Sequence, residues 1–160
     1  LFFYHHPKKE EFVKRNVKSI YLSYYHRWDG YEHFKLAKKF GFIERKEGPL
    51  SGNILSYDNI DEKLCEIHIW FKMLKFGFWR PTDQCCYQIW NKRMSRDEAV
   101  DLVLEKQYEF PYEYLREFLE YHEITEKELY DCMEKFRNLD IWHKVNNRWK
   151  LKNEIKVLNE

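Results

Sequence analysis

Apolar residues recur every three or four positions through the middle of the chain, which is the spacing of one face of an α-helix. Asp58 precedes the longest such run and Gly77 follows it, and these residue types favour the start and the stop of a helix. The pattern predicts one long helix over residues 58–77. Its apolar stripe consists of Ile60, Leu64, Ile67, Phe71 and Leu74.

Local start signals predict further helices on both sides of this one. Ser95 with Glu98, and Thr125 with Glu128, each form a capping box, in which two side chains satisfy free backbone N–H groups at a helix start. The other expected starts are Asp29 for a helix that stops at Gly41, Thr82 or Asp83 for a helix that runs to Trp90, and Pro111.

The N-terminal segment has the pattern of a strand, a helix and a second strand. Leu1–Tyr4 is apolar, Pro7 suits the first turn of a helix that would run to Val17, and residues 20–25 form a β-prone apolar run. Such a unit is typical of a parallel sheet. We therefore expect these residues to be the last elements of a sheet whose other strands lie upstream.

The C-terminal segment has the pattern of a β-hairpin. Residues 142–145 and 148–151 flank Asn146 and Asn147, and asparagine tolerates the positive φ that a two-residue turn needs. In this register Trp142, Trp149 and Leu151 share one face and are expected to pack on the helices. The fold class predicted is mainly α, with α+β character from the strands at the two ends.

Composition predicts a folded chain and narrows its partners. Hydrophobic residues make up 44% and aromatic residues 19% of 160 positions, enough for a core; most rings are expected to pack there, and a few could line a pocket. The net charge of +1 gives no basic excess for a nucleic-acid partner. No apolar run approaches the length that spans a membrane. The four cysteines show no disulfide framework, which favours the cytoplasm.

Metal and nucleotide motifs give little support to a complete active site. Cys65 and His68 have metal-ligand spacing and could combine with Cys85 and Cys86, but a structural zinc site normally pairs its ligands on turns. Buried thiols are the favoured interpretation, and no metal is expected. The sequence contains neither a P-loop nor a dinucleotide-binding glycine motif.

The densest polar cluster lies around Gly77 and could bind an anion. An arginine can hold a phosphate or a carboxylate through two parallel hydrogen bonds, and the N–H groups of a following helix would add donors. The alternative is that the lysines are surface charges and the threonine and aspartate only cap a helix. The cluster consists of Lys72, Lys75, Arg80, Thr82 and Asp83.

Several collinear motifs resemble one enzyme family, the N-acetyl sugar amidotransferases of bacterial surface-polysaccharide synthesis. The resemblance extends over nearly the whole chain. Trp79 and Pro81 depart from it, because the family usually has small residues at these places. The motifs are Tyr21–Tyr25, Trp28–Tyr31, Ala37–Phe42, Lys75–Gln84, Met94–Val100 and the tail from Phe136 to Lys152.

The resemblance implies a reaction. Members of the family are PP-loop ATPases that convert the acetamido group of a sugar into an acetamidino group, as in lipopolysaccharide, flagellin-glycan and pseudaminic acid biosynthesis. ATP with Mg²⁺ would adenylate the amide oxygen, and ammonia from a separate glutaminase subunit would displace AMP. The family's pyrophosphate loop is absent from this sequence. We therefore expect it upstream, and we expect this chain to bind no cofactor by itself.

The resemblance also implies a division of the chain and a site. Residues 1–28 would end the Rossmann-like PP-loop domain, residues 29–137 would form a helical substrate or cap region, and residues 138–160 the hairpin and tail. Two alternatives remain open, a non-catalytic helical module that docks the glutaminase and a decayed fragment. The candidate contacts to phosphate or sugar are Lys75, Arg80, Thr82, Asp83, Trp28 and Asp29, with Asp61, His68 and Lys72 as further candidates. Trp28 and Asp29 follow the strand expected at residues 20–25, at the edge where open α/β sheets place their ligands.

Overall fold

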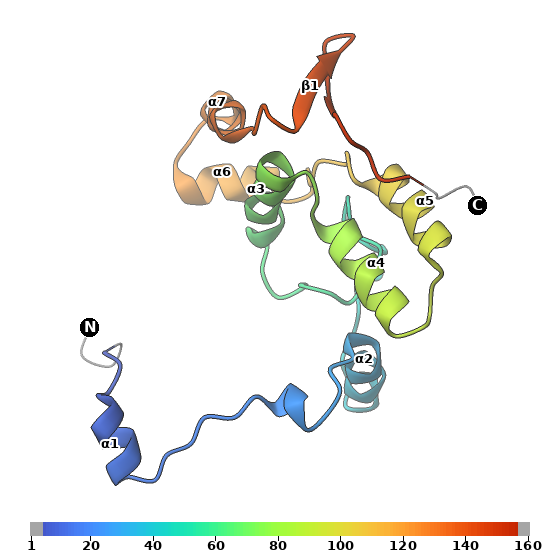
Figure 1. The fold of residues 1–160 in the computed structure, drawn as a ribbon. Coiled ribbons are helices and arrows are strands. Elements are labelled where there is room, and N and C mark those ends of the chain that lie inside the picture. The colour runs from blue at the N-terminus through green and yellow to red at the C-terminus, as the bar shows by residue number, and fades with distance from the viewer. Residues whose placement is uncertain (1–4, 157–160) are drawn as a thin grey trace. The chain divides into compact units, whose positions relative to one another are not determined.

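The computed structural model describes residues 5–156. The chain divides after Gly30 into two compact units. The first contains a short helix, α1 (Lys9–Lys14), and one turn of 3-10 helix, η2 (Leu22–Tyr24), and neither buries a residue (Figure 1). The helix expected from Pro7 to Val17 is therefore present in shortened form.

The prediction of a strand over residues 20–25 is wrong. These residues form η2 and its flanks, and Tyr21 and Tyr24 are more than four-fifths exposed. A β-strand is stable only when a neighbouring strand takes up its backbone hydrogen bonds. In residues 5–156 the only sheet is the C-terminal hairpin, so the segment has no such neighbour there. The strand expected at Leu1–Tyr4 lies outside the described residues.

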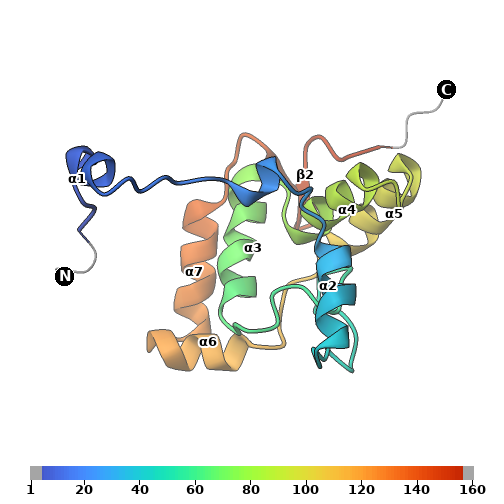
Figure 2. The ribbon, with the colours of Figure 1, turned by 90° about the horizontal axis from the view of Figure 1, so that it is seen from below.

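The second unit is helical and ends in a two-stranded antiparallel sheet, so the mainly α fold class is confirmed. Figure 2 shows α3 and α7 side by side with α6 across one end. The elements are α2 (Gly30–Lys39), α3 (Cys65–Phe76), α4 (Arg80–Trp90), α5 (Arg96–Lys106), α6 (Leu115–His122), α7 (Glu126–Phe136), β1 (Trp142–Val145) and β2 (Arg148–Leu151).

The local signals near the C-terminus predicted their elements correctly. Both capping boxes form, at the starts of α5 and α7. The hairpin has the expected strands, and Asn146 and Asn147 have φ values of 49° and 62°. Trp142 and Leu151 are buried, while Trp149 of the same face is half-buried.

Three helix starts differ from the expectation. α3 begins at Cys65 rather than at Asp58, whose carboxylate instead accepts hydrogen bonds from Arg80 and Gln84. Thr82 and Asp83 lie inside the first turn of α4, so neither caps it. Proline suits a first turn, but α6 begins one turn after Pro111.

The core consists of three clusters that meet along α3 and α4. Ile67 and Leu74 of α3 pack against α6 and α7. The opposite side of α3 carries Met73, which packs with Trp79 and with the hairpin. Cys85 of α4 packs against Ala99 and Val103 of α5. The segment between α2 and α3 packs beside these clusters, and its residues 49–55 form one wall of the candidate site.

Candidate functional site

The loop of residues 49–55 is held in place by side chains from two directions. Glu113 accepts hydrogen bonds from the backbone N–H of Ser51 at 2.7 Å and from its hydroxyl at 2.9 Å. Glu109 accepts the N–H of Gly52 at 2.9 Å. On the other side Gln84 of α4 accepts the N–H of Ile54 at 2.7 Å. The loop backbone is therefore fixed although it has no regular secondary structure.

The buried carboxylate of Glu66, on α3, also binds this loop. Glu66 of α3 is 1% exposed, and it receives hydrogen bonds from Arg80 at 3.1 Å, Asn53 at 3.0 Å and Asn59 at 3.1 Å. The second terminal nitrogen of Arg80 donates to Asp58 at 3.2 Å. A buried charge is stable only when it is paired and hydrogen-bonded. The ion pair between Glu66 and Arg80 meets this condition and ties the loop to α3 and α4.

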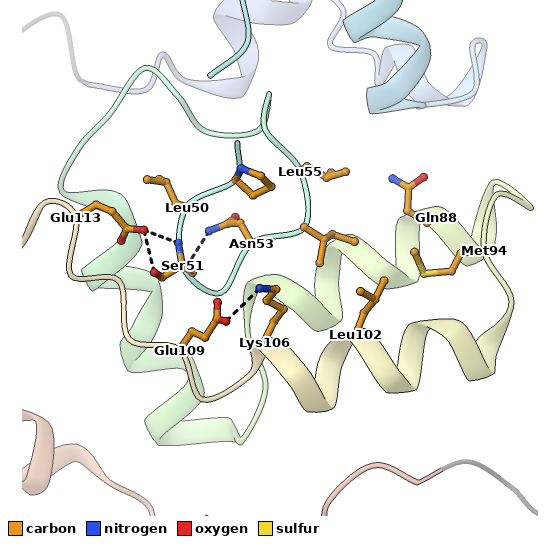
Figure 3. Close-up of a pocket in the computed structure, with 12 residues that line it drawn as sticks. Leu50, Ser51, Asn53, Leu55, Gln88, Met94, Leu102, Lys106, Glu109 and Glu113 are labelled. Carbon is orange, nitrogen blue, oxygen red and sulfur yellow. Dashed lines mark hydrogen bonds and ion pairs between the residues drawn. The ribbon is translucent and has the colours of Figure 1, made fainter. Parts of the chain in front are cut away.

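A cavity of about 710 Å³ lies between this loop, α4, α5 and the segment that follows α5. Figure 3 shows Ser51, Lys106, Glu109 and Glu113 toward one end, and Met94 and Leu102 toward the other together with the polar side chain of Gln88. The complete lining is Pro49, Leu50, Ser51, Asn53, Ile54, Leu55, Gln88, Met94, Leu102, Lys106, Glu109 and Glu113.

The polar end of the cavity is rich in hydrogen-bond acceptors. Lys106 donates to Glu109 at 3.1 Å and pairs with Glu105 at the same distance, and these two contacts raise the pKa of the lysine. Glu113 contacts Ser51 through one carboxylate oxygen. Ionised carboxylates only accept hydrogen bonds. The cavity therefore suits a ligand with hydroxyl or amide donors and an apolar group, and it does not suit a phosphate.

The residues expected to bind an anion are present but already paired. Arg80 has a side chain 14% exposed and is occupied by Glu66 and Asp58, not by Asp83. Lys72 pairs with Asp83 at 2.5 Å and lies over the ring of Phe78. The ammonium of Lys75 lies 4.7 Å from the ring centre of Phe136. Thr82 is half-buried in the first turn of α4.

The other predicted site residues do not line the cavity. Asp61 and His68 are exposed, the first in the turn before α3 and the second on α3. Trp28 and Asp29 precede α2 in the N-terminal unit, where the strand that was expected to present them does not form. Sequence reasoning missed the carboxylates of Glu109 and Glu113. Their spacing of four positions was the available signal, but they lie in a segment without helical pattern.

Trp79, one of the departures from the family pattern, belongs to the core. Its side chain is fully buried, packs with Met73 and Trp142, and donates its ring N–H to the carbonyl of Gln107 at 3.0 Å. It therefore does not narrow the cavity from inside. Pro81, the other residue that departs from the family pattern, is also buried.

The cysteines occupy different environments. Cys85 is 2% exposed, Cys86 is exposed, and Cys65 and Cys132 are half-buried. The expectation of buried thiols is thus confirmed for Cys85 and wrong for Cys86. In the described part of the chain, no three His, Cys, Asp or Glu side chains gather as metal ligands.

We expect Cys85 to be alkylated at least about 100-fold more slowly than Cys86 at pH 8. Burial raises the pKa of the Cys85 thiol to about 11, and only the thiolate reacts. Its rate should therefore rise with pH up to that value. Timed iodoacetamide labelling with peptide mass spectrometry measures both rates, and Cys86→Ser confirms the assignment. Equal rates would show that α4 and α5 open readily.

The second unit is thus a helical domain in which a hydrogen-bonded loop, two helices and the segment after α5 line an open cavity with polar and apolar walls. In the described residues, no helix is long and apolar enough to cross a membrane. Residues 51–156 match the family described as the C-terminal domain of WbpG-like LPS biosynthesis proteins. The match covers well over half of the chain, which therefore belongs to this family. No match was found among curated proteins.

Proposed function

We propose that this chain is the substrate-binding C-terminal part of an ATP-dependent amidotransferase, which converts the acetamido group of a sugar into an acetamidino group during lipopolysaccharide biosynthesis. The membership in an LPS biosynthesis family supports the pathway. The reaction itself follows from the resemblance of the motifs. The observation that carries the proposal is the cavity beneath the loop of residues 49–55.

The chemistry of the cavity is suited to an N-acetylated sugar. The ring hydroxyls and the amide N–H of such a sugar are donors, and Glu109 and Glu113 are acceptors at one end. The acetyl methyl group needs an apolar wall, which Met94 and Leu102 provide at the other end. Sites of this size usually combine an apolar lining with a few polar groups that fix orientation. We assign the orienting contacts to the two carboxylates.

Arg80 acts in this proposal as a positioning residue. It holds Glu66, Glu66 holds Asn53, and Asn53 lies in the loop that lines the cavity. The direct contact to phosphate that the sequence led us to expect for Arg80 is replaced in this proposal by an indirect role. Lys72, Lys75, Thr82 and Asp83 do not line the cavity, and this proposal gives them no contact with the sugar.

The cofactors and partners of the reaction are assigned to other parts of the enzyme. The cluster around Gly77 does not fit a triphosphate, because Arg80 and Lys72 are already neutralised by carboxylates. ATP with Mg²⁺, when bound in the upstream PP-loop domain, supplies the activation of the amide oxygen. A glutaminase subunit supplies ammonia, and the cytoplasm is the compartment where ATP is available.

Filling the cavity should abolish sugar binding. We expect N-acetylglucosamine to receive magnetisation from the protein at its acetyl methyl group in saturation-transfer NMR. Leu102→Trp should remove this signal, because the larger ring occupies the apolar end. Leu139→Trp is the matched control, since Leu139 is 63% exposed. An equal signal in both variants, or none in the unmodified chain, would refute the assignment of the cavity.

A further inference from the structure

Strand β2 has an open edge beside an aromatic pocket. Its partner in the sheet is β1, paired as Val145 with Arg148 and Lys144 with Trp149. Across a two-residue turn the closing pair exchanges hydrogen bonds, and the next pair does not. The N–H and C=O of Trp149 therefore point away from β1. Leu151, two positions on, shows the same direction, because its N–H donates to the hydroxyl of Tyr108 at 3.3 Å.

A pocket of about 330 Å³ lies at this edge. Burial is the larger cause, and a hydrogen bond to Glu154 the smaller, that raises the pKa of Tyr108 to about 12. The neutral phenol therefore donates to Glu154 and accepts from the N–H of Leu151. The pocket is lined by Trp70, Tyr108, Arg137, Trp142, Arg148, Trp149 and Lys150.

The indole walls of the pocket are fixed before any ligand arrives. The guanidinium of Arg137 lies between the rings of Trp142 and Trp149, 5.0 Å and 4.6 Å from their centres. Glu134 accepts hydrogen bonds from Arg137 at 2.6 Å and from the ring N–H of Trp149 at 3.0 Å. The ring N–H of Trp142 donates to Leu74 at 2.9 Å. Little side-chain entropy would be lost on binding.

The hairpin is basic although the whole chain is nearly neutral. Between Trp142 and Lys152 it carries Lys144, Arg148, Lys150 and Lys152 and no acidic residue. Arg148 and Lys150 are exposed, and neither contacts a carboxylate in the described residues. Such charges on an edge strand disfavour non-specific pairing with the apolar edge strands of other proteins. They favour an acidic one, because opposite charges attract across neighbouring strands.

We propose that the edge of β2 binds an extended segment of a partner protein in which an apolar residue stands between two acidic residues. Side chains of a strand alternate between the two faces of a sheet. The residue opposite Trp149 would point to the face with the aromatic pocket. Its two neighbours would lie on the other face, beside Arg148 and Lys150. This mode is β-augmentation, in which main-chain hydrogen bonds give affinity and alternate side chains give specificity.

A small polyhydroxylated ligand fits this pocket less well than the cavity described above. No Asp, Glu, Asn or Gln lines it, so the hydroxyl donors of a sugar would lose their acceptors on binding. The backbone groups of Trp149 require a partner with both a donor and an acceptor at strand spacing. An extended peptide supplies both, and this site is independent of the proposed reaction.

Short synthetic peptides test the proposal on the intact chain. Acetyl-Thr-Glu-Leu-Glu-Thr-amide should shift the amide NMR signals of residues 148–151 and change tryptophan fluorescence in a saturable way. Acetyl-Thr-Leu-Glu-Glu-Thr-amide has the same composition without the alternation, and it should bind at least about tenfold more weakly. Methylation of the leucine nitrogen removes a main-chain donor and should have a similar effect.

Charge reversal provides the decisive variant. Arg148→Glu with Lys150→Glu should weaken the acidic peptide at least about tenfold and bind acetyl-Thr-Lys-Leu-Lys-Thr-amide instead. Arg116→Glu with Lys127→Glu is the matched control on α6 and α7, where both side chains are more than four-fifths exposed. The gain of the basic peptide shows that the reversed hairpin is still folded.

Three results would overturn the proposal. Equal binding of the alternating and the non-alternating peptide would leave only non-specific attraction between charges. Equal binding of the methylated peptide would exclude pairing with the strand edge. Concentration-dependent signals of residues 148–151 without peptide would mean that a second copy of the chain covers the edge.

Discussion

Arg80→Met should lower the free energy of unfolding by about 3–5 kcal/mol, as found when one partner of a buried ion pair is removed. Glu66 would remain 1% exposed without its cation, and Asp58 would keep the hydrogen bond from Gln84 but lose the one from Arg80. Methionine replaces the aliphatic part of the side chain and removes the charge, so the loss is mainly electrostatic. Urea unfolding followed by far-UV circular dichroism measures it.

A double-mutant cycle separates the ion pair from general damage. Adding Glu66→Gln removes the stranded charge, so the double variant should be more stable than the sum of the single effects by at least about 2 kcal/mol. Lys72→Met is the control, because Lys72 pairs with Asp83 at the surface and such pairs contribute at most about 1 kcal/mol. Equal losses of unfolding free energy for Arg80→Met and Lys72→Met would mean that the buried ion pair stabilises the fold no more than the surface pair does.

The same variant tests how the loop above the cavity is held. Ile54 donates its N–H to Gln84, and Gln84 also donates to Asn53 at 2.8 Å and to Asp58 at 2.9 Å. If the network is one unit, Arg80→Met should speed hydrogen exchange at the Ile54 amide more than at amides in α7. The positioning role of Arg80 would then be visible without any assay of activity.

Local signals were sufficient for the C-terminal part of the fold. A capping box satisfies backbone donors within four residues, and a two-residue turn with Asn146 and Asn147 fixes the register of its own strands. Neither needs a distant partner. For this reason α5, α7 and the hairpin begin where the sequence predicted.

Elements that depend on distant partners were predicted poorly. The apolar run at residues 20–25 has β propensity, but propensity does not supply the neighbouring strand. The start of α3 was placed too early because Asp58 has the residue type of a cap. Its carboxylate is engaged by Arg80, 22 positions away, and that contact outweighs local capping.

The cavity was not visible in the sequence for the same reason. Its wall depends on hydrogen bonds from Ser51 to Glu113 and from Gly52 to Glu109, which join positions 62 and 57 apart. Residues 48–53 include two glycines and a proline, which are typical of a loop, but nothing in this stretch indicates the carboxylates that hold it. The motif around Arg80 drew attention to this arginine but did not indicate that Glu66 and Asp58 are its partners in the folded chain.

At Gly52 this loop lies directly against the indole ring of Trp79 in the core. A methyl group added at Gly52 would lie 2.0 Å from one atom of that ring and 2.2 Å from the next. The ring cannot move away easily, because it is fully buried and its N–H is bonded to Gln107. Gly52 also has a φ of +72°, a conformation that strains any residue with a Cβ.

Gly52→Ala should therefore destabilise the chain by at least about 4 kcal/mol, which combines backbone strain with overpacking of a rigid core. Gly48→Ala separates the two causes. Gly48 has a φ of +87° but nothing within 4 Å of the added methyl, so its cost should be only the strain, about 1–2 kcal/mol. Thermal and urea unfolding of the two variants give the difference.

Replacing the indole of Trp79 by a smaller ring should remove the overpacking at Gly52 and leave the backbone strain. Trp79→Phe removes the outer ring atoms that the new methyl would meet, so Gly52→Ala should cost about as much in that background as Gly48→Ala does in the unmodified chain. Trp79→Phe by itself should be destabilising, because it leaves a cavity and frees the carbonyl of Gln107. This non-additive result would show that Gly52 and the ring of Trp79 are in contact. Strictly additive effects of the two substitutions would contradict the contact between Gly52 and Trp79.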